Sequence, residues 1–247
     1  MKRPLEQGLF QLNNVNRTFF SREDSAGDRG VIQQIFVNRD YDLTGFPQHA
    51  NLTAYYSSLI NSGKKPLIID AGANIGASVV YFSAVFPQCK ILAIEPEKDN
   101  CRLLRMNSKG LDVSVLEGGI SCKDGFLFLN DPGYSDWGFR LGKQGDYQVP
   151  VYSVKDLIEE QLGRNLSPFI FKMDIEGGES EVFKESTDWI RFIPVLIIEL
   201  HDWLFPGTSN SNNFLRAISS HNFDFLYRGE NVFCFNNDLL LPGNKTG

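Results

Sequence analysis

A glycine-containing turn directly follows the short apolar run of residues 67–69. From residue 70 to residue 76 it reads Asp70, Ala71, Gly72, Ala73, Asn74, Ile75 and Gly76. Glycine lets the backbone turn tightly and approach a ligand closely, and open α/β sheets bind ligands where such turns follow a strand. A dinucleotide fingerprint has glycine at the position of Asn74, where it admits a pyrophosphate. The turn therefore favours a ligand without phosphates, and the alternative is a structural turn that binds nothing.

Glu95 stands at the end of the next apolar run, residues 91–94. A carboxylate at this place can accept two hydrogen bonds from the vicinal hydroxyls of a ribose. We interpret Glu97 and Asp99 as acids of the first turn of a helix, where they suit the helix dipole. The glycine turn and Glu95 together predict a nucleoside site.

Charged side chains gather after two later apolar runs. Residues 171–179 include Lys172, Asp174, Glu176 and Glu179. Carboxylates so close together repel one another unless a cation, a proton or a hydrogen-bond network compensates. After residues 195–198 come Glu199 and His201, which point to the same side of a strand and can act together. Asp174, Glu199 and His201 are the candidates for acid–base chemistry, and the alternative for His201 is a satisfied polar residue at the end of a strand.

Apolar runs alternate with helical patterns over most of the chain. Strands are predicted at 67–69, 91–94, 113–116, 169–173 and 195–198, and helices at 77–86, 97–109, 180–189 and 212–220. This alternation is typical of an α/β fold with a parallel sheet and helices on both faces. Residues 223–227 and 232–235 predict a terminal antiparallel hairpin. An open, mostly parallel sheet with such a hairpin fits the class I methyltransferase (Rossmann-like) arrangement better than the standard dinucleotide fold, whose last strand is parallel.

The remaining segments have weaker patterns. Residues 1–30 are polar and mixed, which predicts a mobile arm or irregular wrap. A short strand is expected at 31–37, and a helix with one apolar face at 52–60, ended by Gly63. Further strands are expected at 126–129 and 147–152, followed by a helix at 154–162.

Composition narrows the class of protein. The chain of 247 residues is 42% hydrophobic and 22% charged, with a net charge of -6, which is ordinary for a globular protein and argues against a nucleic-acid partner. The longest strongly apolar run, residues 193–200, is too short to span a bilayer, and the start of the chain has no signal-peptide core. We therefore expect a cytoplasmic protein. The four cysteines lack metal or disulfide spacing and are expected to be buried thiols.

These residues, in this order, closely resemble the FkbM family of S-adenosylmethionine-dependent methyltransferases. The resemblance covers about residues 65–236 and is carried by residues 69–76, by Glu95 and Pro96, by residues 172–179 and by residues 198–201. The Lys172-x-Asp174-x-Glu176-Gly177 block is the most specific element, and Gly178 departs from the alanine usual in the family. The chain is accordingly divided into an N-terminal arm and cap helix, residues 1–62, and a methyltransferase domain, residues 63–247.

The resemblance implies roles for individual residues. The methionine end of the cofactor would be lined by the turn, namely by Asp70, Gly72, Ala73, Asn74 and Gly76. Glu95 would hold the ribose, and Glu117 with Gly118 and Gly119 would lie near the adenine. Asp174 would face the cofactor amine or the site of methyl transfer. The family O-methylates hydroxyls of sugars and natural products, so a sugar, glycan or natural-product acceptor is expected.

Methyl transfer to a hydroxyl requires alignment with the sulfonium methyl and removal of the hydroxyl proton. His201 is the first choice of base, with Glu199 orienting it or binding the acceptor, and Asp174 is the second. Asp174, Glu199 and His201 can instead hold a divalent cation such as Mg²⁺ or Mn²⁺, although no metal is predicted. Residues 134–138 are interpreted as a loop over the site, with Trp137 stacking on adenine or acceptor, or packing the loop.

Other functions compete with this interpretation. Residues 131–134 resemble the Asp-Pro-Pro-Tyr motif of enzymes that methylate amino groups on bases, but the second proline is missing and the strand before them is not the fourth parallel one. The alternatives are an NAD-dependent oxidoreductase and a non-catalytic nucleoside-binding scaffold. The helix at 52–60 is interpreted as an acceptor lid or a contact in a homodimer, and the sequence does not decide between them.

Overall fold

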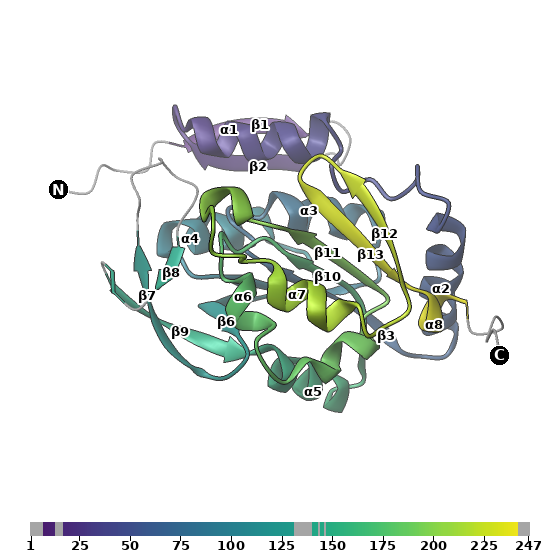
Figure 1. Ribbon diagram of the computed structural model, residues 1–247. Coiled ribbons are helices and arrows are strands. Elements are labelled where there is room, and N and C mark those ends of the chain that lie inside the picture. Colours follow the sequence, from purple (N-terminus) through teal and green to yellow (C-terminus); the bar gives the residue numbers. More distant parts are fainter. Residues whose placement is uncertain (1–6, 13–16, 131–139, 143, 146, 242–247) are drawn as a thin grey trace.

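A seven-stranded sheet forms the centre of the protein (Figure 1). The computed structural model describes residues 7–12, 17–130, 140–142, 144–145 and 147–241. The strands lie in the order β12 (Phe223–Arg228), β13 (Asn231–Asn236), β11 (Val195–Glu199), β10 (Leu166–Met173), β3 (Lys65–Ala71), β4 (Lys90–Glu95) and β5 (Val113–Glu117).

The pairing of these strands confirms the predicted sheet. The neighbours from β11 to β5 are all parallel, whereas β13 is antiparallel to both β11 and β12. The last strand of the sequence therefore runs against its neighbours, as the class I methyltransferase arrangement requires and the standard dinucleotide fold does not. The strand order also brings the carboxyl ends of β3 and β10 side by side.

Alternate residues of each strand face opposite layers of helices. Ile68 and Ile197 belong to a core that includes side chains from α2 (His49–Asn61), α3 (Ala77–Val85) and α4 (Lys98–Asn107). Ile69 and Ile198 belong to the other core, with side chains from α5 (Val154–Gly163), α6 (Glu179–Val182) and α7 (Asn212–Ile218). The sheet is thus covered on both faces, which confirms the predicted fold class.

A second sheet follows β5 in sequence. Its strands lie in the order β6 (Gly119–Ser121), β9 (Tyr147–Ser153), β7 (Gly125–Asn130) and β8 (Arg140–Gly142). The strands expected at 126–129 and 147–152 are confirmed as β7 and β9, which pair antiparallel. Together they place β6 and the start of β7 next to the carboxyl end of β4.

The N-terminal part is more regular than the sequence predicts. Where an irregular arm was expected, β1 (Gln7–Leu12) and β2 (Arg17–Arg22) form an antiparallel hairpin, followed by α1 (Ala26–Ile32); in Figure 1 the purple hairpin and α1 lie together. The prediction was wrong because β2 is held by a distant residue: the Asn107 side chain bonds to both the backbone N–H and the carbonyl of Phe20, at 2.7 and 2.9 Å.

The prediction of a strand at 31–37 is also wrong. The segment continues α1 as a π-helical turn, η1 (Gln33–Val37). Ile32, Ile35 and Phe36 are buried at helical spacing in the core that holds α3, so tertiary packing outweighs the β-propensity of this run. Because Phe19, Leu43 and Leu52 join the same core, residues 17–61 and the sheet share one hydrophobic interior.

The helix expected at 52–60 is confirmed as α2, and its apolar face is turned inward. Leu52 and Leu59 are buried, and the Tyr56 ring stacks against Phe169 at 5.2 Å between centroids. The hydroxyl of Tyr56 accepts a hydrogen bond from the backbone of Gln88, which precedes β4. This part of α2 therefore lies toward the amino ends of the strands, opposite the edge at which ligands bind in such sheets.

The prediction of a single helix at 180–189 is wrong. The segment forms the short helix α6 and then the 3₁₀ helix η2 (Thr187–Phe192), and Ser186 between them is left-handed, with φ 59°. A left-handed residue cannot continue an α-helix. Four further short elements were not predicted: β6, β8, η3 (Asp202–Leu204) and α8 (Asn237–Leu240).

Two predictions from composition can be compared with the structure. All four cysteines are buried, as expected: Cys89, Cys101, Cys122 and Cys234. Among the described residues, no helix has the length and apolar character needed to cross a membrane.

Candidate functional site

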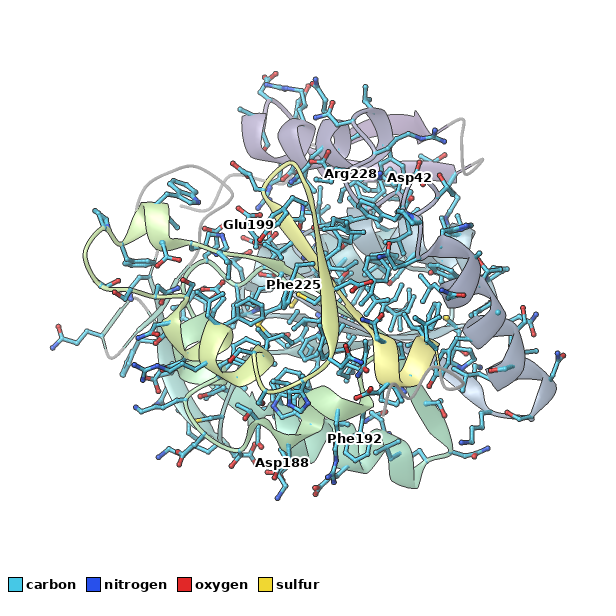
Figure 2. All side chains as sticks on the ribbon, turned by 45° about the vertical axis from the view of Figure 1, so that its right-hand side comes forward. Asp42, Asp188, Phe192, Glu199, Phe225 and Arg228 are labelled. Carbon is cyan, nitrogen blue, oxygen red and sulfur yellow. The ribbon has the colours of Figure 1, made fainter. Side chains whose placement is uncertain are left out.

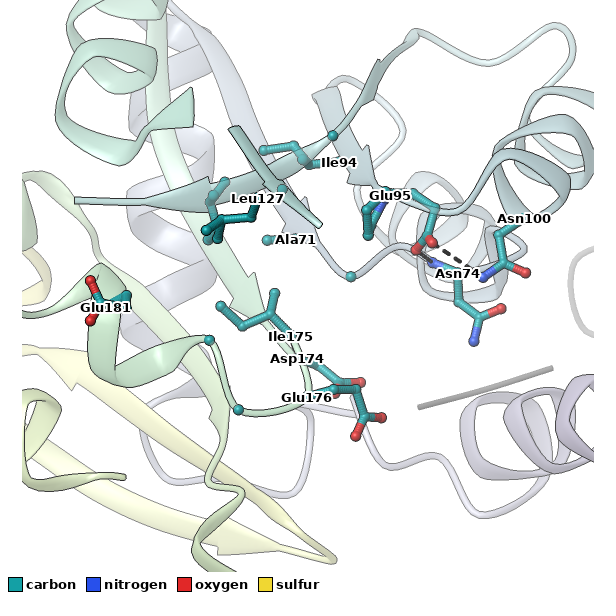
Figure 3. Close-up of a pocket in the computed structure, with 17 residues that line it drawn as sticks. Ala71, Asn74, Ile94, Glu95, Asn100, Leu127, Asp174, Ile175, Glu176 and Glu181 are labelled. Atoms are coloured by element: carbon teal, nitrogen blue, oxygen red, sulfur yellow. Dashed lines mark hydrogen bonds between the residues drawn. The ribbon is translucent and has the colours of Figure 1, made fainter. Parts of the chain in front are cut away.

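A cavity of about 900 Å³, open to solvent, lies at the carboxyl ends of β3, β4 and β10 (Figure 3). Six residues with a role expected from the sequence line it: Gly72, Asn74, Glu95, Gly118, Gly119 and Asp174. The other lining residues are Ala71, Ile94, Pro96, Asn100, Ile120, Leu127, Ile175, Glu176, Gly177, Gly178 and Glu181. The cavity thus forms where the sequence places its glycine turn and two of its strand-end acids.

The glycine of the turn allows two strand ends to touch. Gly72 has φ 77°, and a Cβ atom at this position would lie 1.7 Å from the carbonyl oxygen of Asp174. Only glycine can occupy such a place. Asn74 is also left-handed, with φ 49°, and its side-chain oxygen accepts a hydrogen bond from the Ile75 backbone at 2.7 Å.

Glu95 forms one wall of the cavity and is held by three donors. Its carboxylate accepts hydrogen bonds from the backbone of Asn74 at 2.8 Å, from the backbone of Glu97 at 2.9 Å and from the Asn100 side chain at 3.2 Å. A carboxylate offers about four acceptor positions, so about one remains for a ligand. Burial raises the pKa of Glu95 to about 7, although these hydrogen bonds lower it.

Asn100 is a residue of the site that the sequence did not reveal. It lines the cavity from α4, and its side-chain oxygen accepts a hydrogen bond from Arg22 of β2 at 2.9 Å. Arg22 is in turn anchored by Asp28, with 2.6 Å between the guanidinium and the carboxylate. The N-terminal hairpin therefore supports Glu95 through Asn100.

Asp70 lies behind the turn, away from the cavity. It is fully buried, accepts a hydrogen bond from Ser78 at 2.5 Å and pairs with the Lys172 ammonium at 3.1 Å. Lys172 also donates to the carbonyl of Gly72 at 2.6 Å and lies 3.7 Å from Asp174. Burial lowers the pKa of Lys172, but its neighbours, with Asp70 first and Asp174 among them, together outweigh burial and raise it. Lys172 stays charged and ties the ends of β3 and β10 together.

His201 lies deep behind Asp174 and does not line the cavity. Its Nδ1 is 2.8 Å from Glu179, while its Nε2 is 3.4 Å from Glu199 and 3.7 Å from both Asp174 and Glu176. Only 1% of the His201 side chain is exposed. Burial lowers its pKa, but the hydrogen bond to Glu179 and the surrounding carboxylates raise it to about 11.

The carboxylates around His201 influence one another. Burial and the charge of Asp174 raise the pKa of Glu176 to about 7. Glu179 is fully buried, and its second oxygen accepts a hydrogen bond from Asn210 at 2.9 Å. Glu176 and Glu179 were seen in the sequence as neighbours of Asp174 but were not assigned to the site. Their placement depends on the turn after β10, in which Glu176 and Gly177 are both left-handed.

Four further predicted residues lie outside the cavity wall. Ala73 is buried with its backbone bonded to Ile94, and Gly76 packs under Leu104. Glu199 is buried at the end of β11. Glu117 pairs with Arg105 at 3.2 Å at the end of β5. The expected loop 134–138 with Trp137, and residues 131–134, lie outside the described residues.

Comparison with known families and curated proteins gives one family match and several relatives. The methyltransferase FkbM domain matches residues 70–227. The chain is 28% identical over 140 residues to the hexuronic acid methyltransferase AglP of Haloferax volcanii, covering 56% of each chain. It is 33% identical over 114 residues to the methyltransferase sdnD of Sordaria araneosa, covering 42% of this chain and 38% of that protein. The chain thus spans about half or less of these relatives.

A third relative and two solved structures cover more of the chain. Methyltransferase 1 of Beauveria bassiana is 26% identical over 198 residues, which is 70% of this chain and 73% of that protein. The O-methyltransferase of Bacillus cereus in complex with SAH has a TM-score of 0.42 and 9% identity, and the match covers 84% of this chain and 91% of that one. The fibrillarin pre-rRNA processing protein of Methanococcus jannaschii has a TM-score of 0.44 and 8% identity, and the match covers 94% of this chain and 83% of that one.

Proposed function

This chain belongs to the FkbM family of S-adenosylmethionine-dependent methyltransferases, and we propose that it O-methylates a hydroxyl of a sugar, glycan or natural product. The observation that carries this proposal is the cavity whose wall includes the glycine turn, Glu95 and Asp174. A sugar acceptor is supported by the name of the Haloferax volcanii relative, a hexuronic acid methyltransferase.

The residues on one side of the cavity fit S-adenosylmethionine. Gly72 lets the backbone of the turn meet that of Asp174 at the cavity wall, and Glu95 retains an acceptor position for a ribose hydroxyl. Gly118 and the apolar side chains of Ile120 and Leu127 provide a wall for an adenine. Asp70, Ala73 and Gly76 shape the turn from behind.

On the other side, Asp174 is the group nearest to an acceptor. When bound, S-adenosylmethionine supplies a methyl group that is already activated on its sulfonium. Asp174 is 26% exposed and lines the cavity, so it can accept the hydrogen bond, and then the proton, of an acceptor hydroxyl. His201 and Glu199 lie behind it and act as positioning residues. The preferred general base is therefore Asp174, whereas the sequence analysis ranks His201 first and Asp174 second.

The proposal is tested by calorimetric titration of the protein with S-adenosylhomocysteine. We expect micromolar binding by the wild type. In Glu95→Ala the affinity should fall by roughly tenfold or more, because the ribose hydroxyl loses its hydrogen bond to a carboxylate. Asp112→Ala is the matched control, since Asp112 is an acid at the opposite edge of the sheet, paired with Lys65 and Lys90. Equal affinities in all three proteins, or no binding by the wild type, would reject the cofactor site.

The acceptor is sought with S-adenosylmethionine labelled on its methyl group. A panel of hexoses, hexuronic acids and hydroxylated natural products is screened for label transfer. Asp174→Asn is expected to keep affinity for S-adenosylhomocysteine within a few-fold and to lower turnover by roughly 100-fold or more. Full turnover in Asp174→Asn would contradict its role beside the acceptor.

A further inference from the structure

Three groups converge behind the acceptor side of the cavity. Oxygens of Asp174 and Glu176 and the Nε2 of His201 all lie within 4.8 Å of one another. Asp174 directly follows β10, Glu176 stands in the turn after it, and His201 follows β11. Figure 3 shows Asp174 and Glu176 next to each other at the cavity wall, and both are partly exposed, whereas His201 is buried and does not line the cavity.

The Nε2 atom of His201 is a buried polar atom without a hydrogen-bond partner. It lies 3.4 Å from Glu199 and 3.7 Å from both Asp174 and Glu176, and none of these three contacts has the geometry of a hydrogen bond. A buried polar atom normally has a partner. Its position therefore points to a ligand between the imidazole and the two carboxylates.

Glu179 fixes which nitrogen of His201 faces this place. Its carboxylate, fully buried and held by Asn210, lies 2.8 Å from Nδ1. With Glu179 accepting the Nδ1–H, Nε2 is the nitrogen that faces Asp174 and Glu176, and a bound cation would take the place of the proton that the surrounding carboxylates otherwise favour there. A carboxylate that orients a histidine in this way is the usual partner of a metal-binding imidazole.

The negative charge around His201 also favours binding of a cation. Four carboxylates face the imidazole, those of Asp174, Glu176, Glu179 and Glu199. Lys172 approaches only Asp174 among them and is held between it and Asp70. A protonated His201 offsets only one of these four charges, and like charges at such distances are unfavourable in a buried place unless they are compensated.

We propose that Asp174, Glu176 and Nε2 of His201 bind a divalent cation of the Mg²⁺ or Mn²⁺ class. Two donor atoms that each lie about 2.1 Å from one ion are at most about 4.2 Å apart, so the 3.7 Å between Nε2 and each carboxylate admits an ion between them. Carboxylate oxygens with one imidazole suit Mn²⁺ and Mg²⁺ among biological cations. No metal was predicted from the sequence, and the set differs from the one considered there in having Glu176 in place of Glu199.

Three protein ligands leave coordination positions open toward the cavity. Two neighbouring hydroxyls of a sugar can fill such positions, and a cation lowers the pKa of a hydroxyl that it binds. The site would therefore hold and activate a vicinal diol. This statement about the acceptor rests on the proposed function, whereas binding of the ion does not.

Binding is measured by titrating the chelator-treated, full-length protein with Mn²⁺ and following free Mn²⁺ by electron paramagnetic resonance. We expect one ion per chain and an affinity lower by roughly tenfold or more in His201→Ala and Glu176→Gln. Glu181→Gln is the matched control, because Glu181 lines the same cavity but is not part of the cluster. Glu176→Gln changes a side chain at the cavity wall, so it serves if His201→Ala is unstable.

Titration of each variant with S-adenosylhomocysteine separates the two proposals. Mn²⁺ binding that is weakened in both cluster variants and kept in Glu181→Gln supports the cation site, whether or not the cofactor binds. No Mn²⁺ binding by the wild type, or equal binding in every variant, overturns the cation site even where S-adenosylhomocysteine binds. Loss of cofactor binding in the wild type rejects the proposed function alone.

Discussion

Glu95 has a structural role as a buried carboxylate and, in the proposed function, a binding role as well. Its three hydrogen bonds join the turn after β3 to the start of α4. The same burial that orders it raises its pKa to about 7, so in the ligand-free protein the charge of Glu95 changes within the neutral range of pH. A raised carboxyl pKa means that the group is neutral below about pH 7 and charged above it.

The affinity for S-adenosylhomocysteine should therefore rise with pH between 6 and 8. The charged carboxylate has a free acceptor position for a ribose hydroxyl. Protonation removes an acceptor position, because the proton occupies one of the oxygens. With a pKa of about 7, the expected gain over this range is up to about tenfold. Calorimetric titrations at several pH values measure it. Glu95→Gln has no proton to lose, so an equal rise in that variant would show that another group is responsible.

The sequence predicted those site residues whose place is set by the end of a strand. Gly72, Glu95 and Asp174 follow apolar runs directly, and parallel strands present their carboxyl ends at one edge. Asn100 and Glu179 were not assigned, because their roles depend on which side chain a helix turns toward Glu95 or His201. The depth of His201 was not visible either, since the backbone leaves strand geometry directly after Glu199.

At the scale of elements, the parallel strands and α2 to α5 were predictable because each carries its own periodic pattern. The β1–β2 hairpin and η1 were not, because they are stabilised by partners far away in sequence. Asn107, at the end of α4, is the main link: besides its two bonds to Phe20, it donates to the carbonyl of Ile75 at 2.8 Å. One side chain thus connects β2, α4 and the turn that precedes α3.

Replacing this link should loosen the hairpin. Asn107→Ala removes three hydrogen bonds and leaves buried backbone groups without partners, so we expect the free energy of unfolding to fall by about 2–3 kcal/mol. For a chain of this size this lowers Tm by roughly 5–10 °C. Calorimetry measures Tm, and amide exchange should become faster in residues 17–22. Unchanged exchange in β2 would show that the hairpin is held by other contacts.

At the scale of the molecule, the C-terminal hairpin closes back onto the N-terminal segment. Figure 2 shows Arg228, at the end of β12, next to Asp42. The guanidinium donates to the carbonyl of Asp42 and lies 4.6 Å from the centre of the Phe46 ring. Asn231, on the other side of the same turn, pairs with Glu199 at the end of β11. The turn therefore lies at the edge of the sheet that carries the carboxylates around His201.

Arg228 should accordingly contribute to the stability of the whole chain. Arg228→Ala loses the hydrogen bond to Asp42 and the contact with the face of Phe46, which together are expected to contribute about 1–2 kcal/mol. We expect Tm to fall by roughly 3–6 °C, and by less in Arg228→Lys, which keeps the charge but not the planar fork. Arg216→Ala, an exposed arginine on α7, is the control and should leave Tm unchanged. Equal values of Tm in Arg228→Ala and Arg216→Ala would mean that the two ends of the chain are held together by their hydrophobic contacts alone.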